Sequence, residues 1–545
     1  MAKHTSDEVL DEYNDENSGV TATLCNWITE LEKKDIPDAV LERAKHLILD
    51  GIACGLVGSH VPWSEQAVDA ILSYEPEGHC NLIGYEEKLG PLAAAVLNGG
   101  FIQATELDDY HSVAPLHSAS VVLGSLFAAA QVKNIKVRGS LANGHGNGTN
   151  GTNGTNGVNG TNGTKGTNGT NGTNGTNGTH GTNGTQESGR TVSGADFLVA
   201  AVAGFETGPR SGMAIHGTDL LVRGWHSGVV FGCPAAAAAS SKLLGLSAVN
   251  TESAIGIACT QACGLMAAQF EGMVKRMQHG IAARNGLFGA LLARNGYVGI
   301  KKAYERRYGG FLNMFSQGNT KTPRYNVQEV VAGLGDVWHT ERIRFKLHAC
   351  VGGCHGLVEA IETLQKAYPE QFSSESLKNI KSIKIGLSET IFHHDGWAPH
   401  ERPLSNTGSQ MCAAYISATQ LVDNQVLIAQ FADSQLNRDH VWELVNKTTC
   451  HHDSQFDKPN HQCGAHIVVE FEDGTTVEET AQMPKGFDPP ITNEEIRGKY
   501  RKLASSVIDQ ERLEKIEKLV LEIDQLEDVS ELLEVLAKPA RSAVN

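Results

Sequence analysis

A long tract of Asn-Gly-Thr triplets limits what this chain can fold into. The tract runs from Asn143 to Thr185 with few interruptions and contains almost no apolar residues. A segment of this composition buries no apolar surface, so it cannot offset the conformational entropy that ordering would cost. Its triplets also lack an apolar position that could stack from repeat to repeat, which excludes a solenoid. We therefore expect a disordered surface insertion, and the folded core must come from the sequence on either side.

The sequence on both sides of the tract has mainly helical patterns. Residues 36–56 start with Ile-Pro-Asp and continue with apolar residues at helical spacing. Several other predicted helices are rich in alanine and glycine, and such small residues allow helices to pack closely. These predicted helices cover residues 91–100, 121–131, 194–207, 233–246, 253–269 and 280–295.

A smaller part of the chain has strand patterns. Residues 381–389 alternate between apolar and polar side chains, which predicts a strand. Residues 465–471 and 476–482 flank Glu-Asp-Gly-Thr and predict a β-hairpin. We therefore expect a large helical unit that a smaller mixed segment interrupts. Helical patterns return at residues 410–431, 494–503, 506–521 and 530–536.

The composition excludes several classes of function. The 545 residues are enough for two or more domains, and a net charge of −17 provides no basic surface for nucleic acid. The N-terminal sequence is acidic and polar, unlike a signal or transit peptide, and no apolar run approaches the length of a membrane span. The eleven cysteines lie mostly singly among apolar residues, as reduced thiols do. We expect a cytoplasmic protein that binds neither nucleic acid nor a membrane.

The stretch FIQATELDDYHSVAPLHSAS, residues 101–120, is a dense polar cluster between two apolar segments. Burying such a cluster is costly unless its members pair, so clusters of this kind are often functional sites. The alternative is structural: Asp108 or Asp109 caps a helix, and His117 is satisfied in the core. The polar side chains of the cluster are Glu106, Asp108, Asp109, Tyr110, His111 and His117.

Two shorter motifs offer further candidate residues. In Gly-Trp-His-Ser-Gly, His226 lies between glycines just before a predicted helix, whose N-terminus favours anions. A loop histidine without a role is the alternative. Lys275 and Arg276 precede another predicted helix and could meet carboxylates, and a solvated basic turn is the alternative there.

A zinc site is a weaker hypothesis. Cys350, Cys354 and His355, with Cys450 or Cys463, could supply four ligands. Their spacing matches none of the usual zinc patterns, so we predict no metal site. The sequence also has no glycine-rich phosphate loop after a strand and no Gly-x-Ser-x-Gly elbow, and it indicates no nucleotide, flavin or pyridoxal cofactor.

Seven stretches together resemble the MmgE/PrpD family, and within it the fungal cis-aconitate decarboxylases. The similarity runs from about residue 20 to the C-terminus and is broken only by the Asn-Gly-Thr tract. The stretches are LERAKHLILDGIACGLVG, NLIGYEEKLGPLAAA, FIQATELDDYHSVAPLHSAS, GWHSGVVFG, GIACTQACGLMAAQFEGMVKRMQHGIAARNG, RRYGGFLNMF and QEVVAGLGDVWHT.

The resemblance implies an α+β fold with two domains. A large helical bundle would be built from both chain ends, as residues 18–272, with the repeat at 143–186 inside them, and residues 406–545. A smaller α+β lid domain, residues 273–405, would be inserted and lie over a cleft. Members of the family are typically homodimers and need no metal or organic cofactor, so we expect a homodimer without a cofactor.

The resemblance also implies the site residues. The family's acidic position falls on Glu106, its hydroxyl position on Tyr110, its two histidines on His117 and His226, and its lysine on Lys275. Its lid-domain tyrosine falls on His348, so this chain has an imidazole where the family usually has a phenol.

These residues suit a decarboxylation. Loss of CO2 from the carbon next to the double bond of cis-aconitate leaves an allylic carbanion, which must be stabilised and then protonated. We predict that His117 protonates carbon, while His226 and Lys275 bind carboxylates. Tyr110, Glu106 and Asp109 would orient His117 or keep it protonated, and Arg276 and His348 would bind substrate.

The predicted substrate is a small tricarboxylate. It is either cis-aconitate, which gives itaconate, or a 2-alkyl-cis-aconitate of fungal secondary metabolism, which gives an alkylitaconate. Three alternatives stay open from the sequence. They are a dehydratase of 2-methylcitrate or an alkylcitrate, a non-catalytic tricarboxylate-binding relative, and a zinc-dependent interaction module.

Overall fold

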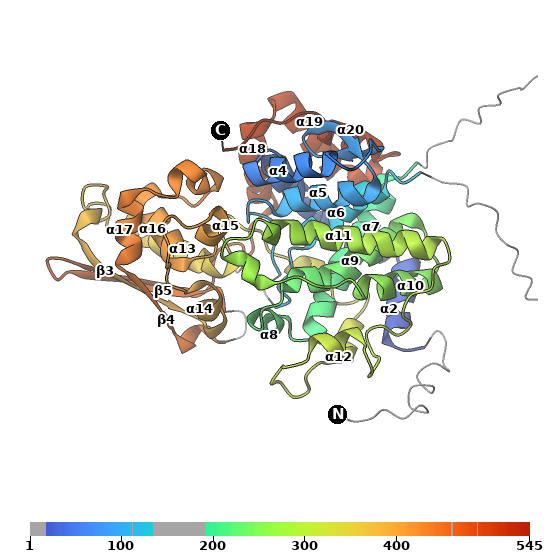
Figure 1. The fold of residues 1–545 in the computed structure, drawn as a ribbon, viewed down its shortest axis with the longest axis horizontal. Coiled ribbons are helices and arrows are strands. Elements are labelled where there is room, and N and C mark those ends of the chain that lie inside the picture. Colours follow the sequence, from blue (N-terminus) through green and yellow to red (C-terminus); the bar gives the residue numbers. More distant parts are fainter. Residues whose placement is uncertain (1–17, 112, 134–190, 459–460, 488, 545) are drawn as a thin grey trace, which may run out of the picture. The chain divides into compact units, whose positions relative to one another are not determined.

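The computed structural model describes residues 18–111, 113–133, 191–458, 461–487 and 489–544. Within these residues the chain is rich in helices and forms two small β-sheets, which confirms the predicted α+β class (Figure 1). The predicted disordered insertion at 143–186 lies outside the described residues.

Helices rich in small residues form the centre of the helical part. α11 packs against α5, α9 and α10, and α9 also packs against α6 and α7. α11 begins earlier than predicted, so Lys275 and Arg276 lie in its first turn and not before it. The bounds are α5 Pro91–Gln103, α6 Ser118–Ala129, α7 Gly194–Ala214, α9 Ser227–Leu244, α10 Ala248–Cys259 and α11 Val274–Arg294.

Glycines allow three of these helices to cross closely. A Cβ at Gly99 of α5 would lie 2.8 Å from the Cα of Gly280 of α11, and a Cβ at Gly124 of α6 would lie 2.8 Å from the Cα of Gly99. A Cβ at Gly280 would lie 1.9 Å from the carbonyl oxygen of Val96. The backbones are therefore in contact at a point where no larger residue fits. This crossing fixes α5 and α11, whose ends carry much of the site.

Helices from the two ends of the chain pack together. α3, Asp38–Ser59, contacts α18, Asn493–Val507, and α19, Gln510–Leu521. The ammonium of Lys499 in α18 lies 2.6 Å from the carboxylate of Asp50 in α3, and both side chains are buried. The last helix, α20 at Ser530–Leu536, contacts the strand β1 at Cys80–Leu82.

A four-stranded sheet with the order β4-β3-β5-β6 forms the mixed part. β3, Ile380–Leu387, pairs in parallel with β4, Thr448–His452, and antiparallel with β5, Ala465–Phe471; β5 then pairs antiparallel with β6, Thr476–Ala481. The structure thus confirms the predicted strand and hairpin. It also places the boundary we predicted at residue 405 between β3 and the other three strands.

Short helices cover this sheet. α13, His355–Ala367, contacts β5 and β6, and α16, Ala413–Asp423, contacts β4, α13 and α17, Asp439–Asn446 (Figure 1). α14, Glu389–Asp395, follows β3 directly and contacts both β3 and β4. Figure 1 also labels α2 Val20–Glu30, α4 Pro62–Leu72, α8 Gly217–Val222, α12 Phe311–Phe315 and α15 Asn406–Gln410. The strand β2, Tyr85–Leu89, pairs antiparallel with β1.

One helix of the described residues, α9, is long and apolar enough to cross a membrane by length and composition. Of its 18 residues, 94% are buried inside the protein. Its neighbours are α6, α7, α10 and α11, which is the environment of a core helix.

Candidate active site

The turn that follows α5 brings a carboxylate between two lysines. Glu106 adopts a left-handed backbone conformation with φ of 55°, which turns the chain away from the helix. Its carboxylate is paired with the ammonium of Lys275, lies 3.5 Å from that of Lys346, and accepts a hydrogen bond of 2.7 Å from Gln103. All four side chains are buried. A buried carboxylate between two ammonium groups is compensated, and we take Glu106 to be ionised.

Burial and the neighbouring charges shift the pKa of Glu106 in opposite directions. Burial raises the pKa of Glu106, but Lys275 and Lys346 outweigh it and hold that pKa well below its usual range. Burial lowers the pKa of Lys275, while Glu106 acts against that effect. Lys346 also lies 4.0 Å from the carboxylate of Asp108, so it has two acidic neighbours, whereas Lys275 pairs with Glu106 and lines the cavity, where a substrate carboxylate can reach it.

Two adjacent aspartates act on two different parts of α6. The carboxylate of Asp108 lies 3.2 Å from Nδ1 of His117, the residue that precedes α6. The carboxylate of Asp109 accepts hydrogen bonds of 2.7 and 2.8 Å from the backbone N–H groups of Ser118 and Ala119. Asp109 therefore holds the N-terminus of α6, as the structural alternative predicted, while Asp108 contacts the imidazole.

Tyr110 lies beside His117 in the site. Its backbone exchanges two hydrogen bonds of 2.8 Å with that of Arg344, which fixes the loop to the segment just before Lys346. The centres of the Tyr110 and His117 rings are 5.9 Å apart. Burial raises the pKa of the Tyr110 phenol well above its usual value, so the phenol keeps its proton and can donate a hydrogen bond.

A second histidine faces the site from the start of α9. Nδ1 of His226 lies 2.8 Å from the side-chain oxygen of Gln278, whose amide nitrogen donates to the carbonyl of Leu265. The Gln278 oxygen therefore accepts the Nδ1 proton, and Nε2 of His226 is the acceptor in the neutral ring. Burial, with a smaller contribution from Lys275, lowers the pKa of His226 to about 3.

A third histidine, His279, lies between the other two. Its ring centre is 4.9 Å from that of His117 and 4.7 Å from that of His226. Burial lowers the pKa of His279 well below its usual value, so this ring is neutral. A Cβ at Gly228 would lie 2.4 Å from Nε2 of His279, which explains why the second glycine of the Gly-Trp-His-Ser-Gly motif is needed.

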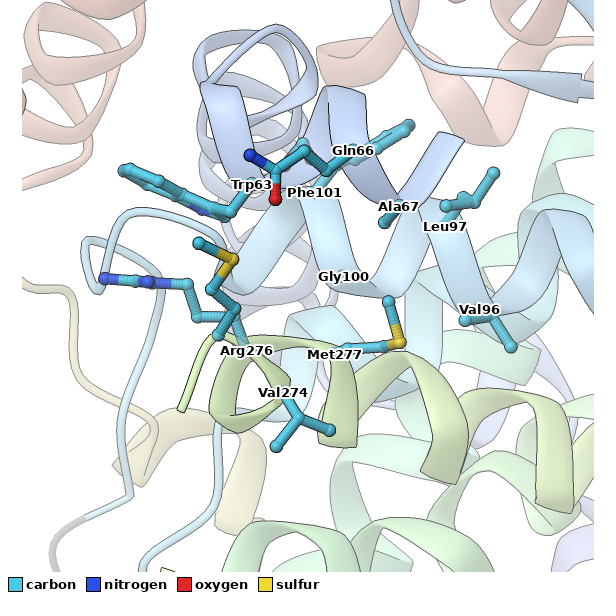
Figure 2. A pocket seen from close by; sticks show the side chains of 12 residues that line it. Trp63, Gln66, Ala67, Val96, Leu97, Gly100, Phe101, Val274, Arg276 and Met277 are labelled. Carbon is cyan, nitrogen blue, oxygen red and sulfur yellow. The ribbon is translucent and has the colours of Figure 1, made fainter. Parts of the chain in front are cut away.

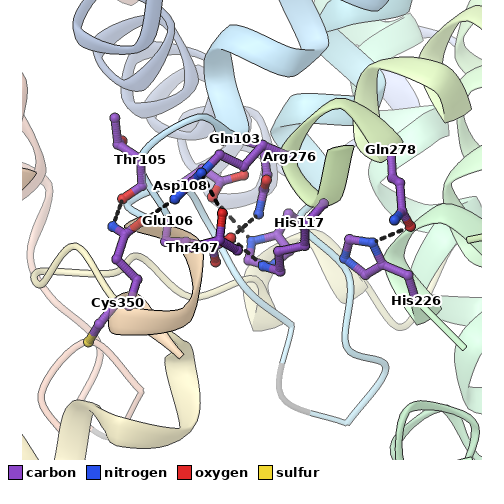
Figure 3. Close-up of polar contacts among 12 residues, drawn as sticks. Gln103, Thr105, Glu106, Asp108, His117, His226, Arg276, Gln278, Cys350 and Thr407 are labelled. Carbon is purple, nitrogen blue, oxygen red and sulfur yellow. Dashed lines mark hydrogen bonds and ion pairs between the residues drawn. The ribbon is translucent and has the colours of Figure 1, made fainter. Parts of the chain in front are cut away.

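Several of these side chains line one cavity between the helical and the mixed parts. Five of the predicted site residues are on its wall: Glu106, Tyr110, His117, His226 and Lys275. Figure 3 shows the polar contacts of Glu106, Asp108, His117 and His226. The rest of the wall includes Met266 and Met411 and, from the mixed part, Val351, Gly352, Gly353, Ile391, His394 and Asp395.

Two predicted substrate-binding residues are not on this wall. The guanidinium of Arg276 donates hydrogen bonds of 2.5–2.8 Å to Gln410, Asn406 and Thr407, and it lies over the ring of Trp63. It lines a different, mainly apolar pocket between α4, α5 and α11 (Figure 2). The ring of His348 packs against that of His355, at 5.1 Å, and burial lowers its pKa to about 4.

Sequence reasoning did not select several residues that the fold brings to the site. Lys346 precedes the predicted position 348 by two residues, and its contact with Glu106 spans 240 residues of sequence. Asp108 and His279 lie in motifs that we singled out, but nothing in a single sequence distinguishes them from their neighbours. His394 and Asp395 lie in no motif that we had selected.

The structure gives no support to the zinc hypothesis. In the part of the chain that the structure describes, no group of three His, Cys, Asp or Glu residues is placed so that it could hold a metal ion. Cys350, Cys354 and Cys463 are buried thiols, and burial raises their pKa values, as expected for neutral core cysteines.

Comparison with known proteins identifies the family of this chain. The MmgE/PrpD N-terminal domain matches residues 22–324, and the MmgE/PrpD C-terminal domain matches residues 348–525. The chain is 61% identical to the cis-aconitate decarboxylase-like protein oryM of Aspergillus oryzae, over 95% of this chain and 97% of that protein. It is 50% identical to the cis-aconitate decarboxylase of Aspergillus terreus, over 96% and 97% of the two chains.

A more distant relative matches over a similar length of the chain. The human cis-aconitate decarboxylase is 23% identical over 96% of this chain and 95% of its own length. Both domains of the family and nearly the whole length of these relatives are thus represented. The chain belongs to the MmgE/PrpD family.

Proposed function

We propose that this protein is a cofactor-independent decarboxylase of cis-aconitate or of a 2-alkyl-cis-aconitate, and that it releases CO2 to form itaconate or an alkylitaconate. The observation that carries the proposal is the single cavity lined by Lys275, His226 and His117, with Glu106 between two lysines. The similarity of this chain to fungal proteins named for this reaction, over nearly the full chain, supports the substrate class.

The reaction requires one bond to break and one to form. The bond between the departing carboxylate and its carbon breaks, and its electron pair enters the allylic system. His117 gives a proton to the far end of that system, and solvent then restores the proton on His117. Asp108 stabilises the imidazolium from which the proton leaves.

The substrate carboxylates that remain bind on the charged side of the cavity. Lys275 binds one of them, because its partner Glu106 is shared with Lys346. His226 is neutral in the free enzyme, and an approaching carboxylate raises its pKa and favours the charged ring. Tyr110 donates from its phenol, and Asp109 acts through the N-terminus of α6.

For Arg276 and His348 we propose positioning roles. Arg276 ties α11 to α15 through its three hydrogen-bond acceptors, which holds the neighbouring Lys275 in place. His348 packs edge-on against His355, whose ring lies 5.8 Å from that of Phe487, and Phe487 contacts Tyr110.

We further propose the two-domain organisation that the family resemblance implies, with a revised boundary. The four strands of the sheet lie between residues 380 and 481, so the lid domain would span about residues 346–487. The helical domain would combine the preceding residues with the C-terminal helices. A cytoplasmic homodimer that binds neither nucleic acid nor a membrane completes the proposal.

The decisive experiment offers the purified protein cis-aconitate and a series of 2-alkyl-cis-aconitates. We expect CO2 release and an itaconate or alkylitaconate product by mass spectrometry, with kcat/KM ranking the substrates. Conversion of 2-methylcitrate or an alkylcitrate without CO2 would instead identify a dehydratase. Tight binding of tricarboxylates without any product would identify a non-catalytic relative.

The same assay tests His117. We expect His117→Ala to lose CO2 release by at least about 100-fold, the range that general acid catalysis contributes. The variant should keep the far-ultraviolet circular dichroism spectrum and the unfolding temperature of the wild type. Near-normal turnover in a folded variant would exclude His117 as the proton donor.

A further inference from the structure

An imidazole and a carboxylate form a pair on the wall of the cavity that the mixed part supplies. His394 and Asp395 are the last two residues of α14, and both line the cavity opposite the helical part. Nδ1 of His394 lies 2.5 Å from the carboxylate of Asp395. The His394 side chain is 7% exposed and that of Asp395 is fully buried. The decarboxylation described above uses neither residue.

The pair leaves one polar atom of each side chain without a partner. Among the described residues, Nε2 of His394 and the second carboxylate oxygen of Asp395 are buried and make no hydrogen bond. A buried polar atom without a partner is costly, and such atoms on a cavity wall are often satisfied by a ligand. Because Nδ1–H of His394 donates to Asp395, Nε2 is the ring atom that remains for a ligand.

Burial and the neighbouring groups shift the pKa of Asp395 in opposite directions. Burial raises the pKa of Asp395, and the adjacent His394 acts against that effect. The thiols of Cys354, Cys412 and Cys450 also lie near this carboxylate, and burial raises the pKa of each, so they stay neutral. Among the groups near Asp395, His394 makes the direct contact. In its charged form the ring donates from both nitrogens, from Nδ1 to Asp395 and from Nε2 to a ligand carboxylate.

The substrate needs a binding group on this wall. A tricarboxylate carries three negative charges, and Lys275, His226 and His117 all belong to the helical side of the cavity. We propose that His394, oriented by Asp395, binds one of the two carboxylates that stay on the substrate, through Nε2. This inference rests on the proposed function for the class of ligand and adds a residue that determines how the ligand is placed.

The experiment measures binding apart from turnover. Tricarballylate has the three carboxylates of cis-aconitate but no double bond, so it cannot lose CO2 through an allylic carbanion. Glutarate lacks its central carboxylate, and 2-methylsuccinate lacks one terminal carboxylate. Calorimetry would give the Kd of each of the three acids for the wild type and for His394→Phe, His394→Gln and Asp395→Asn.

We expect His394→Phe to bind tricarballylate about 10-fold to 100-fold more weakly, as for the loss of one charged hydrogen bond. One of the two dicarboxylates should bind equally well to the wild type and to this variant, and it would identify the carboxylate that His394 contacts. His394→Gln, whose amide can reach the position of Nε2, should recover part of the affinity. Asp395→Asn should weaken tricarballylate binding less than His394→Phe does.

Two results would overturn the inference. One is unchanged tricarballylate binding in a folded His394→Phe variant. The other is an equal loss for all three acids in both His394 variants, which indicates a structural defect. CO2 release by the wild-type protein is measured separately. A wild type that binds tricarballylate but releases no CO2 contradicts the proposed reaction. The binding role of His394 is then still decided by the Kd values of its variants.

Discussion

Asp108 and Asp109 have identical side chains and adjacent positions, yet they contact different groups. One carboxylate lies against the His117 imidazole, and the other accepts two backbone N–H groups of α6. From the sequence we predicted that Glu106 and Asp109 orient His117, whereas the carboxylate beside its ring is that of Asp108. Which aspartate contacts the ring depends on the course of the backbone after Glu106, whose positive φ no sequence pattern indicated.

The two aspartates should therefore separate activity from stability. We expect Asp108→Asn to lower kcat by about 100-fold, because the amide no longer stabilises a charged imidazole. We expect Asp109→Asn to cost about 1–2 kcal/mol of unfolding free energy, because an amide has only one oxygen for the two N–H donors. Denaturant titration and steady-state kinetics on both variants test this. A larger loss of kcat in Asp109→Asn would reverse the two assignments.

The site also contains residues that no sequence argument could assemble. Lys346 meets Glu106 across 240 residues, and His394 reaches the same cavity from a short helix of the mixed part. Contacts over such distances follow from how the elements pack, and a single sequence carries no record of packing. The resemblance to a family supplied Lys275 and His226, which their local patterns alone left undecided.

At the scale of elements, the spacing of apolar residues predicted the strands that have one buried face. The β5–β6 hairpin alternates along its length and was found within one residue of the predicted bounds. β4 was missed because its residues, TTCHH, show no apolar alternation; β3 pairs with it in parallel and no short turn connects them. α11 was predicted to begin too late because its first turn is charged, although Lys275 and Arg276 are buried there.

Adjacent glycines of α5 provide a test of the close helix crossing. A Cβ at Gly99 would lie 2.8 Å from backbone atoms of both α11 and α6, whereas a Cβ at Gly100 would first meet Met277 at 3.9 Å (Figure 2). We expect Gly99→Ala to destabilise the protein by about 1–3 kcal/mol through overpacking. Gly100→Ala should be neutral or stabilise it by up to about 1 kcal/mol, because alanine favours the helix.

Unfolding free energies of the two variants, measured side by side, check this prediction. Both substitutions add the same methyl group to the same helix, so helix propensity cancels in the comparison. Equal effects of the two substitutions would show that the helices move apart at little cost.

At the scale of the whole molecule, buried neutral histidines should make the fold sensitive to acid. Burial lowers the pKa of His111, His226 and His339 to about 3 and that of His348 to about 4. In the unfolded chain the same rings bind protons near pH 6.5. The unfolded state therefore binds more protons below that pH, so stability is complete above about pH 6.5 and falls as the pH drops towards 4.

Unfolding temperatures measured between pH 4.5 and 7.5 test this dependence, with about pH 6.5 as the expected onset of the decline. His348→Phe removes one of the four rings and should make the decline shallower. Replacing the exposed His440 with Gln is the matched control and should leave the slope unchanged. An unfolding temperature that does not fall below pH 6 would contradict the prediction.

The contact between α18 and α3 has a consequence for how the protein is made. Lys499 donates to the carbonyl of Leu107, which lies 392 residues earlier, and pairs with the buried Asp50. On the ribosome, Asp50 and the apolar face of α3 emerge long before the helix that covers them. Until then the apolar face of α3 is exposed and the carboxylate of Asp50 has no Lys499 to pair with. Exposed apolar surface of this kind promotes aggregation and is what chaperones bind. Translation that stops before α18 should therefore leave an aggregating chain and not a smaller enzyme.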